Sequence, residues 1–202
     1  MLLFHSSAVE LAAVFLSVTL AITVHEFAHA WRADLAGDPT PRAAGRLTLN
    51  PIAHFDPIGS LLFLIVGFGW AKPVPVNPLN FRHPRRDGIH VALWGPLSNF
   101  LIAAAAGLAI RVSGIRPEGG VGIFLYVLTL LNLNLGMFNL MPLPPLDGSH
   151  ILSGMLDSRR AYAYEMWSRR YGLFILFAFL YVGFAYLYKF VVFPLYRLLT
   201  GL

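Results

Sequence analysis

The first long apolar segment of this sequence contains three ionisable residues, and this combination constrains the fold more than any other feature. Residues 8–31 are mostly apolar. As a helix rising about 1.5 Å per residue, they are long enough to cross the roughly 30 Å apolar core of a bilayer. His25, Glu26 and His29 lie near the end of this segment, in an H-E-x-x-H sequence. Ionisable side chains are costly in a membrane span, so they indicate a functional site.

The composition also indicates a membrane protein. Of the 202 residues, 57% are hydrophobic and 12% are charged, whereas a soluble domain carries about 25% charged residues. In such a chain the net charge of +5 reports first on topology, so we expect no nucleic-acid partner. The absence of cysteine excludes disulfides and thiolate metal ligands. The first apolar segment lacks a positively charged leader region, so we interpret it as a retained span.

Several apolar segments predict the architecture. Spanning helices are expected at residues 8–31, 89–111, 120–141 and 171–193. Residues 58–70 are apolar but too short to span, which is typical of a re-entrant segment. Alternating valines and prolines in residues 71–78 predict extended chain at a sheet edge. We therefore expect an all-α polytopic membrane protein with about four transmembrane helices, a re-entrant segment and a short β element.

We expect one domain over residues 1–202. Its core, at about 8–155, contains the motifs discussed here, and the remainder, residues 158–202, consists of an amphipathic segment and the last span. Residues 158–170 combine arginine pairs with tyrosine and tryptophan, which favours an interfacial helix or a juxtamembrane segment.

The distribution of basic residues predicts the topology. If residues 58–70 do not cross the membrane, the 15 Lys and Arg residues divide eleven to four between its two sides. The side with more Lys and Arg is normally cytoplasmic. The N-terminus is then expected outside, with His25 and His29 in the cytoplasmic half of the first span. Asp147 is expected just past the cytoplasmic end of the third span.

The H-E-x-x-H spacing predicts a metal site. On a helix, His25 and His29 project from one face, where they can hold one zinc ion at about 2.0–2.1 Å. Glu26 lies beside the first ligand, where a carboxylate can deprotonate a water. A third ligand must come from a distant segment on the same membrane side. The candidates are Asp147, His150, Asp157, His54, Asp56 and His90. Asp147 is favoured because it follows a proline-rich run, whose irregular backbone at membrane depth must line a cavity or pack on protein.

Four sequence elements together resemble one protein family. They are H-E-F-A-H at 25–29, G-P-L-S-N at 95–99, N-L-M-P-L-P-P-L-D-G at 139–148 and the extended segment 69–78. In this combination the chain resembles the site-2 protease family of intramembrane zinc metalloproteases. It is most similar to the minimal prokaryotic branch, which lacks PDZ and CBS domains.

The resemblance implies a role for each matching residue. One zinc ion per chain would be held by His25, His29 and Asp147, with Glu26 as general base. Asn139 would polarise the scissile carbonyl or stabilise the oxyanion. Asn99 would contribute to the substrate pocket, or would instead join helices by hydrogen bonds. In the extended segment, Val74 and Val76 would pair with an unwound substrate.

The expected function is therefore membrane-embedded zinc endopeptidase activity in a multi-pass protein of the cell membrane. The substrate would be a transmembrane protein in the lipid bilayer, cut in or near its span at the cytoplasmic side. The oligomeric state stays open. One alternative is a zinc-binding or zinc-transporting protein, although residues 97–110 and 121–131 are almost wholly apolar and offer no path. The other is an inactive relative that only binds transmembrane segments.

Overall fold

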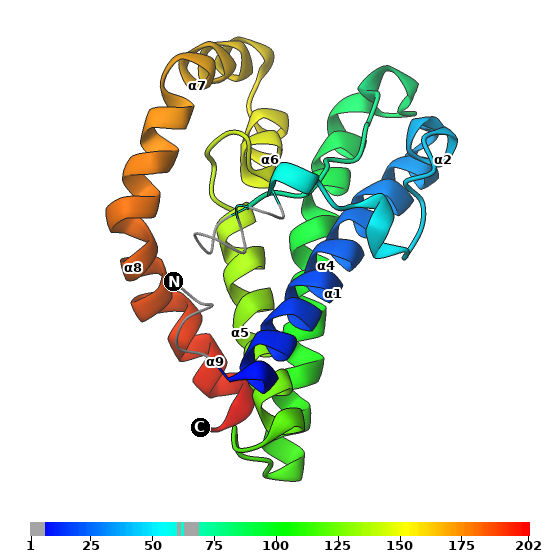
Figure 1. Ribbon diagram of the computed structural model, residues 1–202. Coiled ribbons are helices and arrows are strands. Elements are labelled where there is room, and N and C mark those ends of the chain that lie inside the picture. Colours follow the sequence, from blue (N-terminus) through cyan, green and yellow to red (C-terminus); the bar gives the residue numbers. More distant parts are fainter. Residues whose placement is uncertain (1–6, 60–61, 63–68) are drawn as a thin grey trace.

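The computed structural model describes residues 7–59, 62 and 69–202. Within this part, 4 helices are long and apolar enough to cross a membrane. They are α1 (Ala8–Ala36), α4 (Pro84–Ser113), α5 (Gly120–Asn139) and the long helix Ser158–Thr200. The first three form a bundle, and the fourth leans against it from one side (Figure 1). The predicted all-α polytopic fold is confirmed, and the chain is a multi-pass membrane protein.

Capping residues at both ends determine where α1 begins and ends. The hydroxyl of Ser7 accepts a hydrogen bond from the N–H of Glu10, whose carboxylate accepts from the N–H of Ser7, as in a capping box. At the other end Gly37 has a φ of 105°, a left-handed conformation that favours glycine. The helix extends to Ala36, beyond the predicted boundary at residue 31, because polar residues remain helical until this glycine ends it.

Small residues allow the bundle helices to approach closely. Ala21 of α1 and Ala103 of α4 are 1% and 0% exposed. A Cβ at Gly107 would lie 2.8 Å from the Cβ of Leu199, so the end of the long helix packs directly on α4. Helices in membranes usually associate through close backbone approach at small residues, because the hydrophobic effect contributes little between helices surrounded by lipid.

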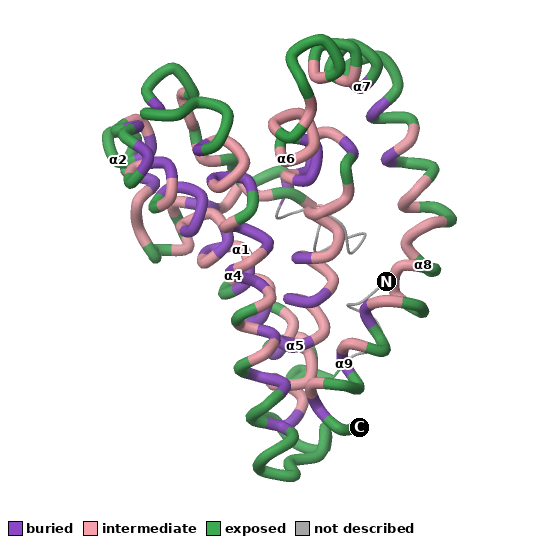
Figure 2. The backbone as a smooth tube through the Cα atoms, turned by 180° about the vertical axis from the view of Figure 1, so that it is seen from behind, coloured by how far each residue is buried: buried purple, intermediate pink, exposed green. Residues whose placement is uncertain are grey.

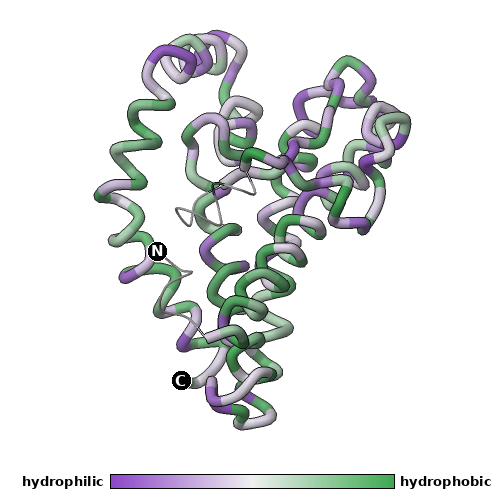
Figure 3. Tube along the Cα trace, viewed as in Figure 1, coloured by the Kyte–Doolittle hydropathy of each residue, from purple (hydrophilic) through white to green (hydrophobic). Residues whose placement is uncertain are grey.

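The long helix contains both residues 158–170, predicted as an interfacial helix or a juxtamembrane segment, and the predicted last span at 171–193. It runs without interruption through α7 (Ser158–Ala178), η4 (Phe179–Gly183), α8 (Phe184–Leu187), η5 (Tyr188–Val192) and α9 (Phe193–Thr200). The two η stretches are π-helical, and no proline or turn separates the basic residues from the apolar ones. Much of its surface is exposed and apolar (Figures 2 and 3), as expected for a helix that faces lipid.

Two apolar clusters of described residues help to attach the long helix to the rest of the protein. Leu176 packs with Leu143 and Leu146 of the proline-rich loop. Nearer the C-terminus, Val192 and Tyr196 pack with residues of α4 and α5. The long helix thereby supports the loop that leads into α6 (Asp147–Met155).

The described parts of the segment between α1 and α4 lie at one end of the bundle (Figure 1). They contain α2 (Thr40–Ala43) and two short 3-10 turns, η2 (Pro51–Ala53) and η3 (Pro78–Asn80). The predicted β element is extended backbone, and within the described residues it makes one antiparallel bridge, between Phe55 and Ala71. A longer ladder does not form here because the prolines of residues 71–78 cannot donate hydrogen bonds.

The predicted re-entrant segment, residues 58–70, falls largely outside the described residues. Its described ends adjoin each other: a Cβ at Gly59 would lie 2.1 Å from the carbonyl oxygen of Trp70. Beside this contact, the N–H of Lys72 donates to the carbonyl of His54 at 2.9 Å. Residues 59 and 70, at the two described ends of this stretch, therefore lie next to each other.

Candidate metal centre

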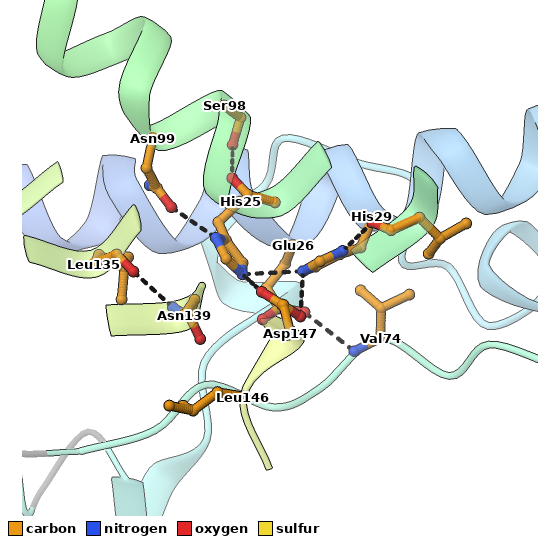
Figure 4. A network of polar contacts seen from close by, with 12 residues as sticks. His25, Glu26, His29, Val74, Ser98, Asn99, Leu135, Asn139, Leu146 and Asp147 are labelled. Atoms are coloured by element: carbon orange, nitrogen blue, oxygen red, sulfur yellow. Dashed lines mark hydrogen bonds and ion pairs between the residues drawn. The ribbon is translucent and has the colours of Figure 1, made fainter. Parts of the chain in front are cut away.

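Three side chains from two distant segments meet at the predicted metal site. His25 and His29 project from one face of α1, and Asp147 reaches them from the start of α6 (Figure 4). The Asp147 carboxylate lies 3.3 Å from each Nε2 atom, and the two Nε2 atoms are 3.0 Å apart. Among the described residues, these three form the one group of His, Cys, Asp or Glu whose ligand atoms cluster closely enough to hold a metal ion.

The other ring nitrogens decide which atoms of the imidazoles face the centre. His29 Nδ1 lies 2.8 Å from the carbonyl oxygen of Val91, which can only accept, so Nδ1 carries the hydrogen. His25 Nδ1 lies 2.7 Å from Asn99 Oδ1. The Asn99 amide nitrogen donates to Asn132 Oδ1 and to the Ala21 carbonyl, which orients its oxygen toward His25. Neutral imidazoles in these tautomers turn two Nε2 lone pairs toward each other.

This arrangement fits a zinc ion. Two lone pairs at 3.0 Å and a carboxylate repel one another unless a cation lies between them. Two ligands of a tetrahedral zinc, each at about 2.0–2.1 Å, lie roughly 3.3 Å apart, close to the distances found here. One Asp147 oxygen, Oδ2, is buried without a hydrogen-bond partner in the described chain. The residues therefore provide three converging ligands for a metal.

Gly95 leaves the space in which the two imidazoles lie. A Cβ at this position would be 2.3 Å from His29 Nε2 and 2.8 Å from His25 Cε1. Any larger residue would displace the ligands. In the G-x-x-x-N pattern, Gly95 thus provides room and Asn99, one turn later on α4, provides the hydrogen bond to His25.

Contacts with neighbouring segments fix the position of the loop and helix that carry Asp147. Gly148 packs so closely on the end of α5 that a Cβ there would lie 2.2 Å from the Leu140 carbonyl oxygen. The hydroxyl of Tyr164, on α7, donates to the Pro142 carbonyl at 3.0 Å. Arg85 of α4 donates to the carbonyl of Gly154 at the other end of α6. The aspartate thus has a fixed approach to α1.

Glu26 lies beside the two histidines on the wall of a cavity of about 900 Å³. One of its carboxylate oxygens accepts a hydrogen bond of 3.1 Å from the backbone N–H of Val74. The cavity is also lined by Val76, Asn139 and Asp147. The structure therefore brings the H-E-x-x-H glutamate, the extended segment and the metal-ligand group into one cavity.

The remaining predicted residues occupy different positions. Asn139 lines the cavity, and its amide donates to the carbonyl of Leu135 in the same helix, leaving a second N–H. Asn99 is 0% exposed and does not line the cavity. Its contacts with His25 and Asn132 favour the alternative role, in which it joins helices.

The alternative third ligands have other partners or lie away from the centre. His54 is fully buried and bonds the Thr48 carbonyl. His90 contacts Arg32. Asp56 and Asp157 accept hydrogen bonds from backbone N–H groups near their own positions. His150 lines the cavity but is exposed, and it lies outside the ligand cluster.

Sequence reasoning missed three groups that support the histidines. They are Asn132, the carbonyl of Val91 and the absent side chain of Gly95. Asn132 had a signal, since an asparagine within an apolar span needs a hydrogen-bonding partner. The Val91 carbonyl had none, because every residue has a backbone carbonyl and only packing selects one.

The chain is thus a multi-pass membrane protein in which two histidines and an aspartate could hold a metal ion, and comparison with known proteins assigns its family. The profile of Peptidase family M50 matches residues 108–182. "Putative zinc metalloprotease YwhC" of Bacillus subtilis is 43% identical over 151 residues, which cover 70% of this chain and 69% of the relative. The chain belongs to peptidase family M50, the site-2 protease family.

Two further relatives match over shorter stretches. "Zinc metalloprotease MJ0392" of Methanocaldococcus jannaschii is 35% identical over 79 residues, covering 39% of this chain and 23% of the relative. "Protease RseP" of Photorhabdus luminescens is 45% identical over 40 residues, covering 20% of this chain and 18% of the relative. No solved structure matches the chain with statistical significance.

Replacing the proposed third ligand tests the metal centre. We expect Asp147→Ala to lower the zinc content of the purified protein markedly, because two imidazoles alone leave the site with too few ligands. His150→Ala is the matched control, since His150 lies on the same helix and cavity wall, and it should retain zinc. Metal analysis by mass spectrometry measures both. Full zinc content in Asp147→Ala would remove this residue from the ligand set.

Replacing Asn99 tests the tautomer argument. Asn99→Leu keeps the size of the side chain but removes the acceptor for His25 Nδ1–H, and we expect zinc affinity to fall about 10- to 100-fold. Asn134→Leu is the control, because within the described part of the chain Asn134 bonds a carbonyl of its own helix and does not contact the histidines. Competition with a zinc chelator gives both affinities. Equal affinities in the two variants would contradict a role for Asn99 in orienting His25.

Proposed function

We propose that this protein is an intramembrane zinc metalloprotease that hydrolyses a peptide bond in or near a transmembrane segment of a membrane protein. One observation carries the proposal: Glu26 lies between the metal-ligand cluster and an extended backbone segment, in a single cavity. A site that only bound zinc would need the ligands but would have no use for this carboxylate or for an adjacent extended segment.

The residues of the cavity suit peptide hydrolysis. Zinc bound at this position would polarise a carbonyl group and lower the pKa of a water molecule to about 7. Glu26 is placed to take the proton from the attacking water and to deliver it to the leaving amine. The second amide N–H of Asn139, beyond the one bonded to Leu135, offers a donor for the negative charge that develops on the scissile carbonyl oxygen.

The extended segment is placed to bind an unwound substrate. A transmembrane helix bonds its peptide groups internally, so it must unwind before cleavage, and the released groups then need partners. The carbonyl of Val74 and both backbone groups of Val76 have no backbone partner within the described chain. Added as a strand along these groups, a substrate would satisfy its own backbone beside Glu26.

The charge distribution supports an orientation. The end of the bundle that carries α2, α6 and the start of α7 (Figure 1) also carries eleven of the 15 Lys and Arg residues. By the positive-inside rule this end is cytoplasmic. We therefore infer that cleavage takes place toward the cytoplasmic side of the cell membrane, with the N-terminus outside.

Replacing the proposed base tests the mechanism. Glu26→Gln keeps the shape of the side chain but cannot accept a proton, so we expect cleavage to be lost, by a factor of at least roughly 100. Zinc content and thermal stability should stay at the wild-type level, because Glu26 is not a ligand in the cluster. Product formation and metal content are measured on the same preparation. Retained cleavage by this variant would contradict the role of Glu26 as general base.

A substrate panel separates the protease from the alternative functions. The detergent-solubilised protein is incubated with several single-span membrane proteins, with and without a chelator. We expect a cut in or near the span of at least one substrate, blocked by the chelator and restored by zinc. Binding without a cut would indicate an inactive relative. Zinc uptake into proteoliposomes without a cut would indicate a transporter.

A further inference from the structure

A buried arginine joins the extended segment to the rest of the protein. Arg46 follows α2 and is only 4% exposed. Its guanidinium donates to the carbonyl of Pro73 at 3.0 Å and to the carbonyl of Lys72. One guanidinium therefore holds two successive carbonyls, immediately before the residue whose N–H bonds Glu26.

A second set of contacts, from His54, holds the same stretch. The carbonyl of His54 accepts from the Lys72 N–H at 2.9 Å. The His54 ring contacts the Arg46 guanidinium at 3.4 Å through Nδ1, and its Nε2 lies 2.8 Å from the Thr48 carbonyl. Since that carbonyl can only accept, Nε2 carries the hydrogen and Nδ1 accepts from Arg46. Arg46 and His54 thus form one hydrogen-bonded unit with residues 72 and 73.

Burying this guanidinium is costly, so its position needs a reason. Among the described residues Arg46 has no carboxylate within ion-pair distance, and its Nε has no hydrogen-bond partner. Burial lowers the pKa of Arg46, and the charge of Glu26 acts in the opposite direction. A buried arginine without an ion pair is not expected to stabilise the fold, so its position is better explained by the backbone carbonyls that it holds.

The far end of the extended segment has its own anchor. Asp38 is 0% exposed and accepts hydrogen bonds from the N–H of Asn77 and the amide of Asn80. Between this anchor and Arg46, the N–H of Val74 bonds Glu26 and the backbone groups of Val76 have no backbone partner in the described chain. The two anchors therefore fix a short stretch that includes Val74 and Val76, which line the cavity.

We propose that Arg46 is a positioning residue for the reaction. Its guanidinium fixes the extended segment through the carbonyls of Lys72 and Pro73, so that the N–H of Val74 holds the Glu26 carboxylate beside the metal centre. The proposal rests on the proposed protease function for its kinetic consequence. The structural consequence, that the extended segment is held in a fixed position, does not depend on the protease function.

Arg46→Lys tests the geometry while keeping the charge. An ammonium group is a compact point charge and cannot reproduce a planar fork that spans two carbonyls and a ring nitrogen. Arg42→Ala is the matched control, because Arg42 lies in α2, four residues before Arg46, but is exposed and pairs with Asp34. Arg46→Gln is a second variant, since a neutral amide is cheaper to bury if the lysine variant does not fold.

Hydrogen–deuterium exchange measures the segment without any substrate. Residues 72–76 contain only three backbone N–H groups, on Lys72, Val74 and Val76, because the intervening residues are prolines. We expect both Arg46 variants to accelerate exchange of this peptide at least roughly tenfold, and Arg42→Ala to leave it unchanged. Wild-type exchange in both Arg46 variants would overturn the proposal.

Kinetics distinguishes a positioning role from a merely structural one. In folded, zinc-loaded Arg46→Lys or Arg46→Gln we expect kcat to fall about 10- to 100-fold, because a small displacement of a reacting group has an effect of this size. The zinc stoichiometry should stay unchanged. Lower thermal stability with a wild-type kcat would show a structural role and overturn the proposal. If the wild-type protein cuts no substrate, the protease function fails, while the exchange result still decides whether Arg46 fixes the segment.

Discussion

Two imidazole nitrogens that face each other inside an apolar bundle are the constraint on which the rest of the site depends. His25 and His29 turn their Nε2 atoms together at 3.0 Å because α4 occupies both of their Nδ1 atoms, through Asn99 and the Val91 carbonyl. Without a cation such an arrangement is repulsive. The packing of α1 on α4 and the capacity to bind a metal are therefore one structural property.

The same packing explains why small residues lie at the contacts of the site. Gly95 allows α4 to pass over the two rings, and Gly148 allows α6 to begin directly on the end of α5. The first contact makes room for the histidines, and the second brings Asp147 to them. In a soluble protein a polar cluster of this kind would be solvated, whereas in lipid every member needs a partner from the protein or a bound ion.

The prolines of the extended segment determine which of its backbone groups can form hydrogen bonds. Pro73 and Pro75 have no N–H, so the stretch cannot complete an ordinary ladder within the protein. Arg46 occupies the carbonyls on one part of it, and Glu26 occupies the N–H of Val74. The groups of Val76 stay without a backbone partner in the described chain. A segment of this kind combines a fixed position with unused hydrogen-bonding capacity, which a substrate strand requires.

Much of this protein was determined by local sequence. Apolar length located the spans, the spacing of His25 and His29 placed both on one helix face, and the proline-rich run marked Asp147 as the preferred third ligand. Helix ends were less predictable: the first helix continues to Gly37, and the basic segment at 158–170 continues into the last span. Periodicity and length are properties of neighbouring residues and can be read from the chain. The partners of the site, namely Asn132, the Val91 carbonyl and Arg46, were decided only by tertiary structure, because a hydrogen bond between distant segments depends on which surfaces pack together.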